Sequence, residues 1–149
     1  MVLEKYKAKR NFKKTPESKG EVKNEKSENT IFVVHEHHAS HLHWDLRLEM
    51  AGVLKSWAIP KEPPREPTIK RLAILVEDHP LDYAKFEGTI PEGSYGAGKV
   101  IIWDKGNYEL VEKTEKGFVI KLKGNKLKGT YVLFKFKPPN NWLFFKKKE

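Results

Sequence analysis

The sequence of 149 residues contains no cysteine, which excludes two kinds of site at once. Neither a disulfide framework nor a zinc site with thiolate ligands can form in this chain. Long apolar runs are also missing, because no stretch approaches the roughly 20 residues that an α-helix needs to cross a bilayer. The first residues lack the apolar segment of a signal peptide. These absences predict an intracellular, cytoplasmic protein without a membrane partner.

Acidic side chains are in the minority, with 20 aspartates and glutamates against 29 lysines and arginines and a formal net charge of +9. Such an excess favours a polyanionic partner, usually nucleic acid, although lysines also simply keep a surface soluble. Residues 1–30 are polar and lysine-rich, so we expect an extended, flexible basic N-terminal segment there. Residues 31–149 suit a single domain with its own core, and we expect a monomer.

Helical periodicity is absent over any long stretch, whereas the alternation typical of strands is clear. Leu42–Met50 alternates strictly between apolar and polar side chains, which indicates a strand buried on one face. Ala51-Gly52 then forms a tight turn into a second strand at Val53–Ile59, so a hairpin is expected. Further strands are predicted at Ile31–Val34, Arg71–Glu77, Lys99–Trp103, Tyr108–Glu112, Phe118–Leu122, Thr130–Lys137 and Trp142–Phe145.

The segments between these strands carry turn-forming residues. Turns are predicted at 105–107, 116–117 and 124–125, and loops at 60–67 and 89–98. One short helix is expected around Leu81–Phe86. Many short strands at this spacing predict a mainly β fold, a compact antiparallel β-barrel with one short helix at most.

Five of the six histidines lie between Val34 and Trp44, and imidazole is a common metal ligand. His43 and Asp45 are two residues apart on the alternating strand, so both project from its polar face. Spacing leaves the third ligand open between His35 and His37. Two imidazoles and a carboxylate suit manganese, iron(II) or zinc, and three protein ligands leave positions for water or substrate. The alternative is an exposed polar face with scattered histidines.

Arg47 lies on the same polar face, and its charge indicates which kind of ligand the metal would bind. A cation beside a metal ion is unfavourable unless an anion lies between them, and a phosphate bound by both removes the conflict. His79 is held extended by the following Pro80 and can donate to phosphate or act as a general acid, or can be an ordinary loop histidine. Tyr83 can donate its hydroxyl to phosphate, and Glu77 can orient a ligand.

A resemblance to a known family rests on four segments: YKAKRNFKKTPE, FVVHEHHASHLHWDLRLEMAGVLKSWAIPKEPP, RLAILVEDHPLDYAKFEGTIPEGSYGAGKVIIWDKGNYE and KLKGTYVLFKF. Together they resemble the 3′-phosphoesterase domain of bacterial ligase D over nearly the whole chain. The resemblance implies a β-barrel whose crescent-shaped face holds manganese and a phosphate. It also implies DNA repair by non-homologous end joining, in which a phosphodiesterase step removes a 3′-terminal ribonucleoside and a phosphomonoesterase step then leaves a 3′-hydroxyl.

The same resemblance implies a role for individual residues by position. Its metal ligands are His37, His43 and Asp45. Its phosphate contacts are Arg47, His79 and Tyr83. The rest of the site consists of Lys61, Arg71 and Glu77, with support from Arg10 and Glu17.

Further expectations concern the cofactor, the partners and the departures from the family. The expected cofactor is Mn²⁺, with Co²⁺ or Zn²⁺ as other options. The expected partners are nucleic-acid 3′ ends and, since no ligase or polymerase module accompanies these residues, a separate ligase, polymerase or end-binding protein. Asn11 replaces the family's usual aspartate and cannot transfer its proton. His38 and His41 are expected in outer or surface positions.

Two other functions fit parts of the pattern. A non-haem iron oxygenase also uses two histidines and a carboxylate. That class needs a distal histidine well downstream of the other two ligands, and His79 is the only downstream histidine. The surrounding arginines and lysines, which suit phosphate, argue against this class. Oxygen consumption with iron and 2-oxoglutarate would identify that class. A nucleic-acid-binding barrel without catalysis would use aromatic side chains such as Trp57, Trp103 and Trp142 to stack bases. Turnover of a nucleic-acid substrate would exclude it.

Overall fold

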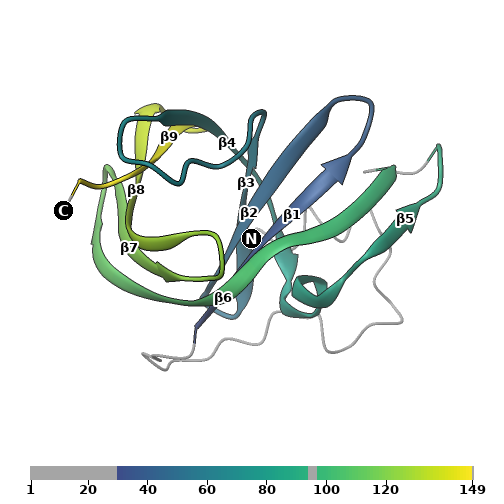
Figure 1. Cartoon of the computed structure of the whole chain (residues 1–149), viewed down its shortest axis with the longest axis horizontal. Coiled ribbons are helices and arrows are strands. Elements are labelled where there is room, and N and C mark those ends of the chain that lie inside the picture. Colours follow the sequence, from purple (N-terminus) through teal and green to yellow (C-terminus); the bar gives the residue numbers. More distant parts are fainter. Residues whose placement is uncertain (1–29, 94–96, 149) are drawn as a thin grey trace.

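The computed structural model describes residues 30–93 and 97–148, and almost all of this part is β-structure (Figure 1). Its strands are β1 (Ile31–His38), β2 (Leu42–Met50), β3 (Val53–Ile59), β4 (Lys70–Pro80), β5 (Gly88–Ile90), β6 (Gly98–Thr114), β7 (Gly117–Lys123), β8 (Lys128–Lys137) and β9 (Asn141–Lys146). A short 3-10 helix, η2 (Leu81–Lys85), lies where one helix was predicted. No helix in the described part is long and apolar enough to cross a membrane. The predicted N-terminal segment lies outside the described residues.

The strands close into an antiparallel barrel, which confirms the predicted fold class. The order is β1-β2-β3-β4-β9-β8-β7-β6, and β6 returns to pair with β1, while β5 adds to the far edge of β6. The predicted hairpin between β2 and β3 is confirmed, with Ala51 at φ 51° and Gly52 at φ 83°. Two consecutive positive φ values match the right-handed twist of the flanking strands.

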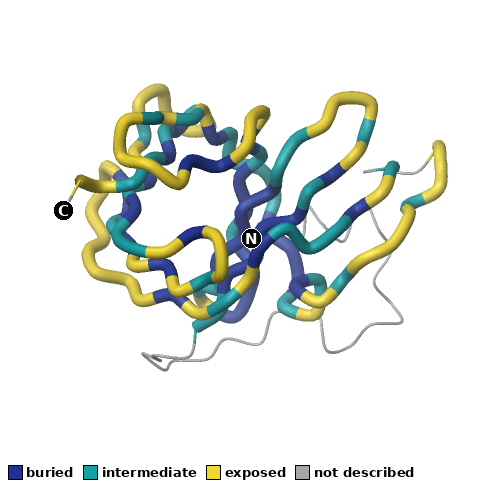
Figure 2. The backbone as a smooth tube through the Cα atoms, viewed as in Figure 1, coloured by how far each residue is buried: buried dark blue, intermediate teal, exposed yellow. Residues whose placement is uncertain are grey.

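The first three strands present two faces with different surroundings. One face carries Leu46, Leu48 and Trp57, which pack into the barrel core with residues from the other barrel strands. The opposite face carries His35, Asp45 and Arg47, which are also buried although they are polar. It lies outside the barrel interior, beside a small cluster of Val33, Leu54 and Ala84 that brings in η2. In Figure 2 the tube is dark blue along the central strands and yellow at the loop tips.

Residues 98–114 differ from the prediction of two strands separated by a turn. They form the single long strand β6, which pairs first with β1 and then with β7 (Figure 1). Gly106 does not make a turn but lies within β6, where a Cβ at this position would clash with the backbone of Lys123. The glycine therefore permits close approach of two chain segments. The predicted loop at 89–98 is also partly wrong, since Gly88–Ile90 pairs with the start of β6.

Asp104 on β6 anchors the turn between β7 and β8, and this gives a prediction about stability. Its buried carboxylate accepts backbone N–H groups of Asn125, Lys126 and Leu127 at 2.9, 3.1 and 2.8 Å. We expect Asp104→Ala to lower the free energy of unfolding by about 3 kcal/mol, because three backbone donors, the buried N–H of Leu127 among them, lose their charged acceptor. Urea denaturation measures this change. Glu109→Ala, an exposed site on the same strand, is the control, and a loss below about 1 kcal/mol for Asp104→Ala would contradict the prediction.

Candidate active site

A pocket of about 410 Å³ opens on the face of β1, β2 and β3 that turns away from the barrel core. The strand β4, the helix η2 and the segment before β6 contribute its other walls. Seven of the residues predicted from the sequence line it: His37, His43, Asp45, Arg47, Glu77, His79 and Tyr83. The fold thus brings residues 37–47 of one hairpin together with 77–83 of another segment.

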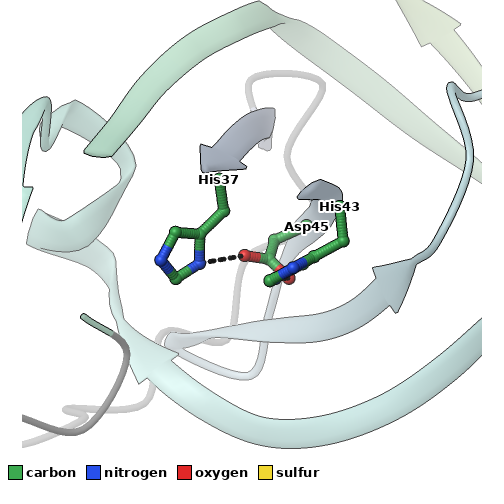
Figure 3. Close-up of side chains that lie close together, drawn as sticks. All are labelled: His37, His43 and Asp45. Carbon is green, nitrogen blue, oxygen red and sulfur yellow. Dashed lines mark ion pairs between the residues drawn. The ribbon is translucent and has the colours of Figure 1, made fainter. Parts of the chain in front are cut away.

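His37, His43 and Asp45 form a compact group among the residues that line this pocket (Figure 3). One potential ligand atom from each residue lies within 4.8 Å of the other two. His37 Nδ1 is 3.6 Å from Asp45 Oδ2, and His43 Nε2 is 3.3 Å from Asp45 Oδ1. The register of β1 and β2, which pairs His37 with His43, puts both imidazoles beside the same carboxylate.

The ring nitrogens that face away from Asp45 orient both imidazoles. His37 Nε2 lies 3.2 Å from the Ala97 carbonyl, and His43 Nδ1 lies 3.1 Å from the His41 carbonyl. A carbonyl only accepts, so each of these nitrogens carries a proton, and in the neutral imidazole the other nitrogen presents a lone pair to the group. Metal-binding histidines usually donate their second N–H in this way. Two nitrogens and a carboxylate oxygen therefore fit a divalent transition metal such as manganese, iron(II) or zinc.

The charges around Asp45 hold it ionised despite its burial. Burial alone would raise the pKa of Asp45, but the Arg47 charge and hydrogen bonds from His37 and His43 outweigh it and hold the pKa below its ordinary value. The hydrogen bond to Asp45 raises the pKa of His43. A metal ion would take the place of the proton on the His43 nitrogen that faces Asp45, because metal ligands bind in their deprotonated forms.

Arg47 lies next to this group, and its guanidinium is almost fully engaged. Its Nη2 donates to Asp45 Oδ2 at 3.3 Å, its Nη1 donates to Ser56 Oγ at 2.9 Å, and its Nε donates to His35 Nδ1 at 3.1 Å. A fourth N–H, on Nη1, faces His79 Nδ1 at 3.2 Å. Since a guanidinium has five N–H groups, one remains for a ligand if His79 Nδ1 accepts the fourth, and two remain if Nδ1 is protonated and donates to the Glu77 carbonyl. A two-pronged contact from Arg47 to phosphate would require the second case.

His79 and Tyr83 line the same pocket and lie beside Arg47. His79 Nδ1 lies 3.1 Å from the Glu77 carbonyl as well as close to Arg47, so its proton decides which neighbour it bonds. The Tyr83 ring packs against three of the site's side chains, with centroid distances of 4.8 Å to His79, 5.3 Å to His35 and 4.9 Å to the Arg47 guanidinium carbon. Pro80, in extended geometry, is the N-cap of η2, the helix that carries Tyr83.

Two of the remaining predicted residues, Lys61 and Arg71, do not line the pocket. Lys61 is exposed in the loop after β3, and Arg71 donates from Nε to the Glu62 carbonyl at 2.7 Å, so neither lines the pocket. Arg10 and Glu17 lie outside the described residues, as does Asn11. Two histidines of the sequence cluster, His38 and His41, are exposed, and His38 pairs with Glu36 at 2.6 Å.

Three further residues belong to the site: His35, Ser56 and Phe86. Spacing in the sequence leaves His35 open as a third metal ligand, but both its nitrogens are occupied, one by Arg47 and one by the Phe86 carbonyl at 3.1 Å. Burial, and next the Arg47 charge, lower the pKa of His35 to about 3. The predicted hairpin could have identified Ser56, because a two-residue turn at 51–52 pairs this residue with Arg47 on the neighbouring strand. No sequence signal identified Phe86.

Comparisons with known proteins point to one family. A family model described as the DNA Ligase D 3′-phosphoesterase domain matches residues 35–135. A multifunctional non-homologous end joining protein LigD from Pseudomonas aeruginosa is 49% identical over 139 residues, which cover 89% of this chain and 16% of that protein. The Mycobacterium tuberculosis protein LigD is 45% identical over 141 residues, covering 89% and 18%. That of Mycolicibacterium smegmatis is 40% identical over 155 residues, covering 97% and 20%. The chain thus spans a fifth or less of these relatives.

Proposed function

Because the chain belongs to the DNA ligase D 3′-phosphoesterase family, we propose that it hydrolyses phosphoesters at the 3′ ends of nucleic acids in DNA repair by non-homologous end joining. The metal is bound by His37, His43 and Asp45, with Mn²⁺ as the proposed ion and Co²⁺ or Zn²⁺ as other options. The reaction proceeds in two steps, a phosphodiesterase step that removes a 3′-terminal ribonucleoside and a phosphomonoesterase step that leaves a 3′-hydroxyl.

A single observation carries the proposal: a buried arginine shares the pocket with a group of residues that can bind a metal. Arg47 and a metal ion would both bind Asp45, and two cations at this distance need further anionic charge between them. A phosphate supplies it. When bound, the metal supplies Lewis acidity and a bound water of lowered pKa.

The side chains around the pocket have separate tasks in this proposal. Arg47 offers its remaining N–H to an equatorial phosphate oxygen, where charge grows in the transition state. Tyr83 donates its hydroxyl to phosphate. His79 either donates to phosphate or protonates the leaving oxygen, and the carbonyl of Glu77 beside its Nδ1 orients its ring.

Residues outside the pocket would act on the nucleic acid rather than on the reacting phosphate. Lys61 and Arg71 flank the loop between β3 and β4 and would bind phosphates farther along the strand. We propose that residues 31–149 form one phosphoesterase domain, to which the basic segment 1–30 adds Arg10 and Glu17. A separate ligase, polymerase or end-binding protein would act on the same end.

The alternative of a barrel that only binds nucleic acid has less support. Trp57 and Trp142, which would have to stack on bases, are 0% and 1% exposed and pack against each other in the core. Only half-buried Trp103 would be available among these three tryptophans. Base stacking needs an accessible aromatic face, so the aromatic argument for this alternative largely disappears.

The test is end processing of a defined substrate. A primer–template with one 3′-terminal ribonucleotide is incubated with the protein and Mn²⁺, and the products are separated by length and by 3′ group. We expect a primer shortened by one nucleoside that carries a 3′-phosphate, followed by its conversion to a 3′-hydroxyl. Chelation of the metal should stop both steps. If a molar excess of protein cleaves nothing with Mn²⁺, Co²⁺ or Zn²⁺, the proposed function is wrong.

A further inference from the structure

His35 is fully buried beside the active site, yet neither metal binding nor phosphate binding uses it. It lies on β1 opposite Asp45, and its side chain points to the same face as Arg47. The pocket itself is lined by other residues, so His35 lies behind the reacting groups. A fully buried imidazole needs partners for both nitrogens, and these partners indicate its function.

Each nitrogen of His35 has one fixed partner of definite polarity. The Phe86 carbonyl, 3.1 Å from Nε2, can only accept, so Nε2 carries the proton. Nδ1 is then an acceptor, and it receives the Nε–H of Arg47 at 3.1 Å. The tautomer that serves Phe86 is therefore also the one that serves Arg47. The residue Phe86 follows η2 directly and stacks on Tyr83 at a centroid distance of 5.1 Å.

The bond to Nε has a particular effect on the guanidinium. Nε joins the rigid guanidinium plane to the flexible alkyl stem, so a bond at this atom restricts rotation of the whole plane. Ser56 and Asp45 hold the terminal nitrogens, and the three contacts together fix the directions of the N–H groups that they leave free. A donor fixed in advance costs no reorganisation when charge develops in the transition state.

We propose that His35 is a positioning residue for the phosphoester cleavage: its Nδ1, oriented by the Phe86 carbonyl, fixes the Arg47 guanidinium so that the free N–H meets the transition state. The inference rests on the proposed function. It predicts a specific kinetic signature, because a misaligned donor weakens transition-state binding more than substrate binding. Loss of His35 should lower kcat and leave KM nearly unchanged.

The experiment compares His35→Leu, His35→Gln and wild type with Mn²⁺ and the 3′-ribonucleotide primer. For His35→Leu we expect kcat to fall about 30-fold, with KM and Mn²⁺ affinity within about 3-fold of wild type. His35→Gln should stay within about 5-fold, since one amide supplies an acceptor for Arg47 and a donor for Phe86. His38→Leu, an exposed site on the same strand, should leave kcat unchanged.

A double mutant separates positioning from a general loss of structure. If His35 acts through Arg47, His35→Leu should cost little further activity in the Arg47→Lys background, because Nε–H is already gone. Additive losses would overturn the proposal. So would a wild-type kcat in His35→Leu, or a loss in a folded His35→Gln as large as that in His35→Leu. If His35→Leu does not fold, His35→Phe takes its place.

A spectroscopic readout is independent of turnover. In ¹⁵N-labelled protein, the Arg47 Nε–H should give a slowly exchanging signal in wild type and His35→Gln and lose this protection in His35→Leu. Equal protection in all three proteins would contradict the assignment. A wild-type protein that cleaves no primer would refute the proposed function, whereas an active wild type with an unaffected His35→Leu would refute only the positioning role.

Discussion

Asp45→Asn is expected to abolish phosphoester cleavage, with kcat/KM falling at least about 1,000-fold and Mn²⁺ affinity at least about 100-fold. The carboxylate of Asp45 contacts the three other charged or ligating side chains of the site. Its oxygens lie 3.3 Å from His43 Nε2, 3.6 Å from His37 Nδ1 and 3.3 Å from Arg47 Nη2. The amide removes the negative charge that a cation needs but keeps an oxygen for hydrogen bonds. Folding should therefore persist, and the free Mn²⁺ signal in electron paramagnetic resonance measures the lost affinity.

Asp82→Asn is the matched control for this prediction. Asp82 is an exposed carboxylate in the first turn of η2 and does not line the pocket. The same substitution there should change neither Mn²⁺ affinity nor cleavage. If Asp45→Asn binds Mn²⁺ with wild-type affinity and retains full activity, Asp45 is not a metal ligand, and His37 and His43 must act in some other way.

Arg47→Lys is expected to lower kcat by about 100- to 1,000-fold while Mn²⁺ affinity changes less than about 3-fold. Lysine keeps the positive charge but has no planar guanidinium, so it loses the contacts to His35 and Ser56 that orient the donor. Its ammonium would also be free to move toward Asp45. Single-turnover cleavage with saturating Mn²⁺ isolates the chemical step from product release.

The control for Arg47→Lys is Arg65→Lys. Arg65 is an exposed arginine in the loop before β4, where it pairs with Glu62 at 3.1 Å. Surface ion pairs of this kind contribute little, and the substitution should not alter kcat. If Arg47→Lys cleaves at the wild-type rate, charge alone is sufficient at this position, and the claim that a fixed guanidinium stabilises the transition state is wrong.

The hairpin of β2 and β3 shows how far local sequence rules lead. Strict alternation over Leu42–Met50 and the turn at Ala51-Gly52 predicted both strands at the bounds that the structure has. That register also pairs Arg47 with Ser56 and would have identified this serine. Side-chain period and turn chemistry are local properties, so the sequence displays them directly.

Long-range pairing was beyond the sequence, and His35 is the clearest case. Its polarity and spacing resemble those of a metal ligand, and only the contact with Phe86, 51 residues away, gives it another function. The same limit explains β6, where Gly106 suggested a turn but instead allows close approach of Lys123. Contacts between distant segments depend on barrel closure, which local patterns do not encode.

Lys61 and Arg71 illustrate a different limit. The resemblance implied that both complete the site, yet the structure shows Lys61 exposed and Arg71 bonded to the Glu62 carbonyl, away from the pocket lining. A match by position can imply that a residue participates, but not at which distance from the reacting atoms. The proposed contact of Lys61 and Arg71 with a longer nucleic-acid strand agrees with their positions outside the pocket.

The central claim is that a divalent metal lies between His37, His43 and Asp45. Anomalous diffraction at the manganese absorption edge, from crystals of the protein with Mn²⁺, tests it most directly. We predict one strong peak at bonding distance, about 2.0–2.3 Å, from His37 Nδ1, His43 Nε2 and a carboxylate oxygen of Asp45. A peak elsewhere, with these three side chains still bonded only to one another, would contradict the account.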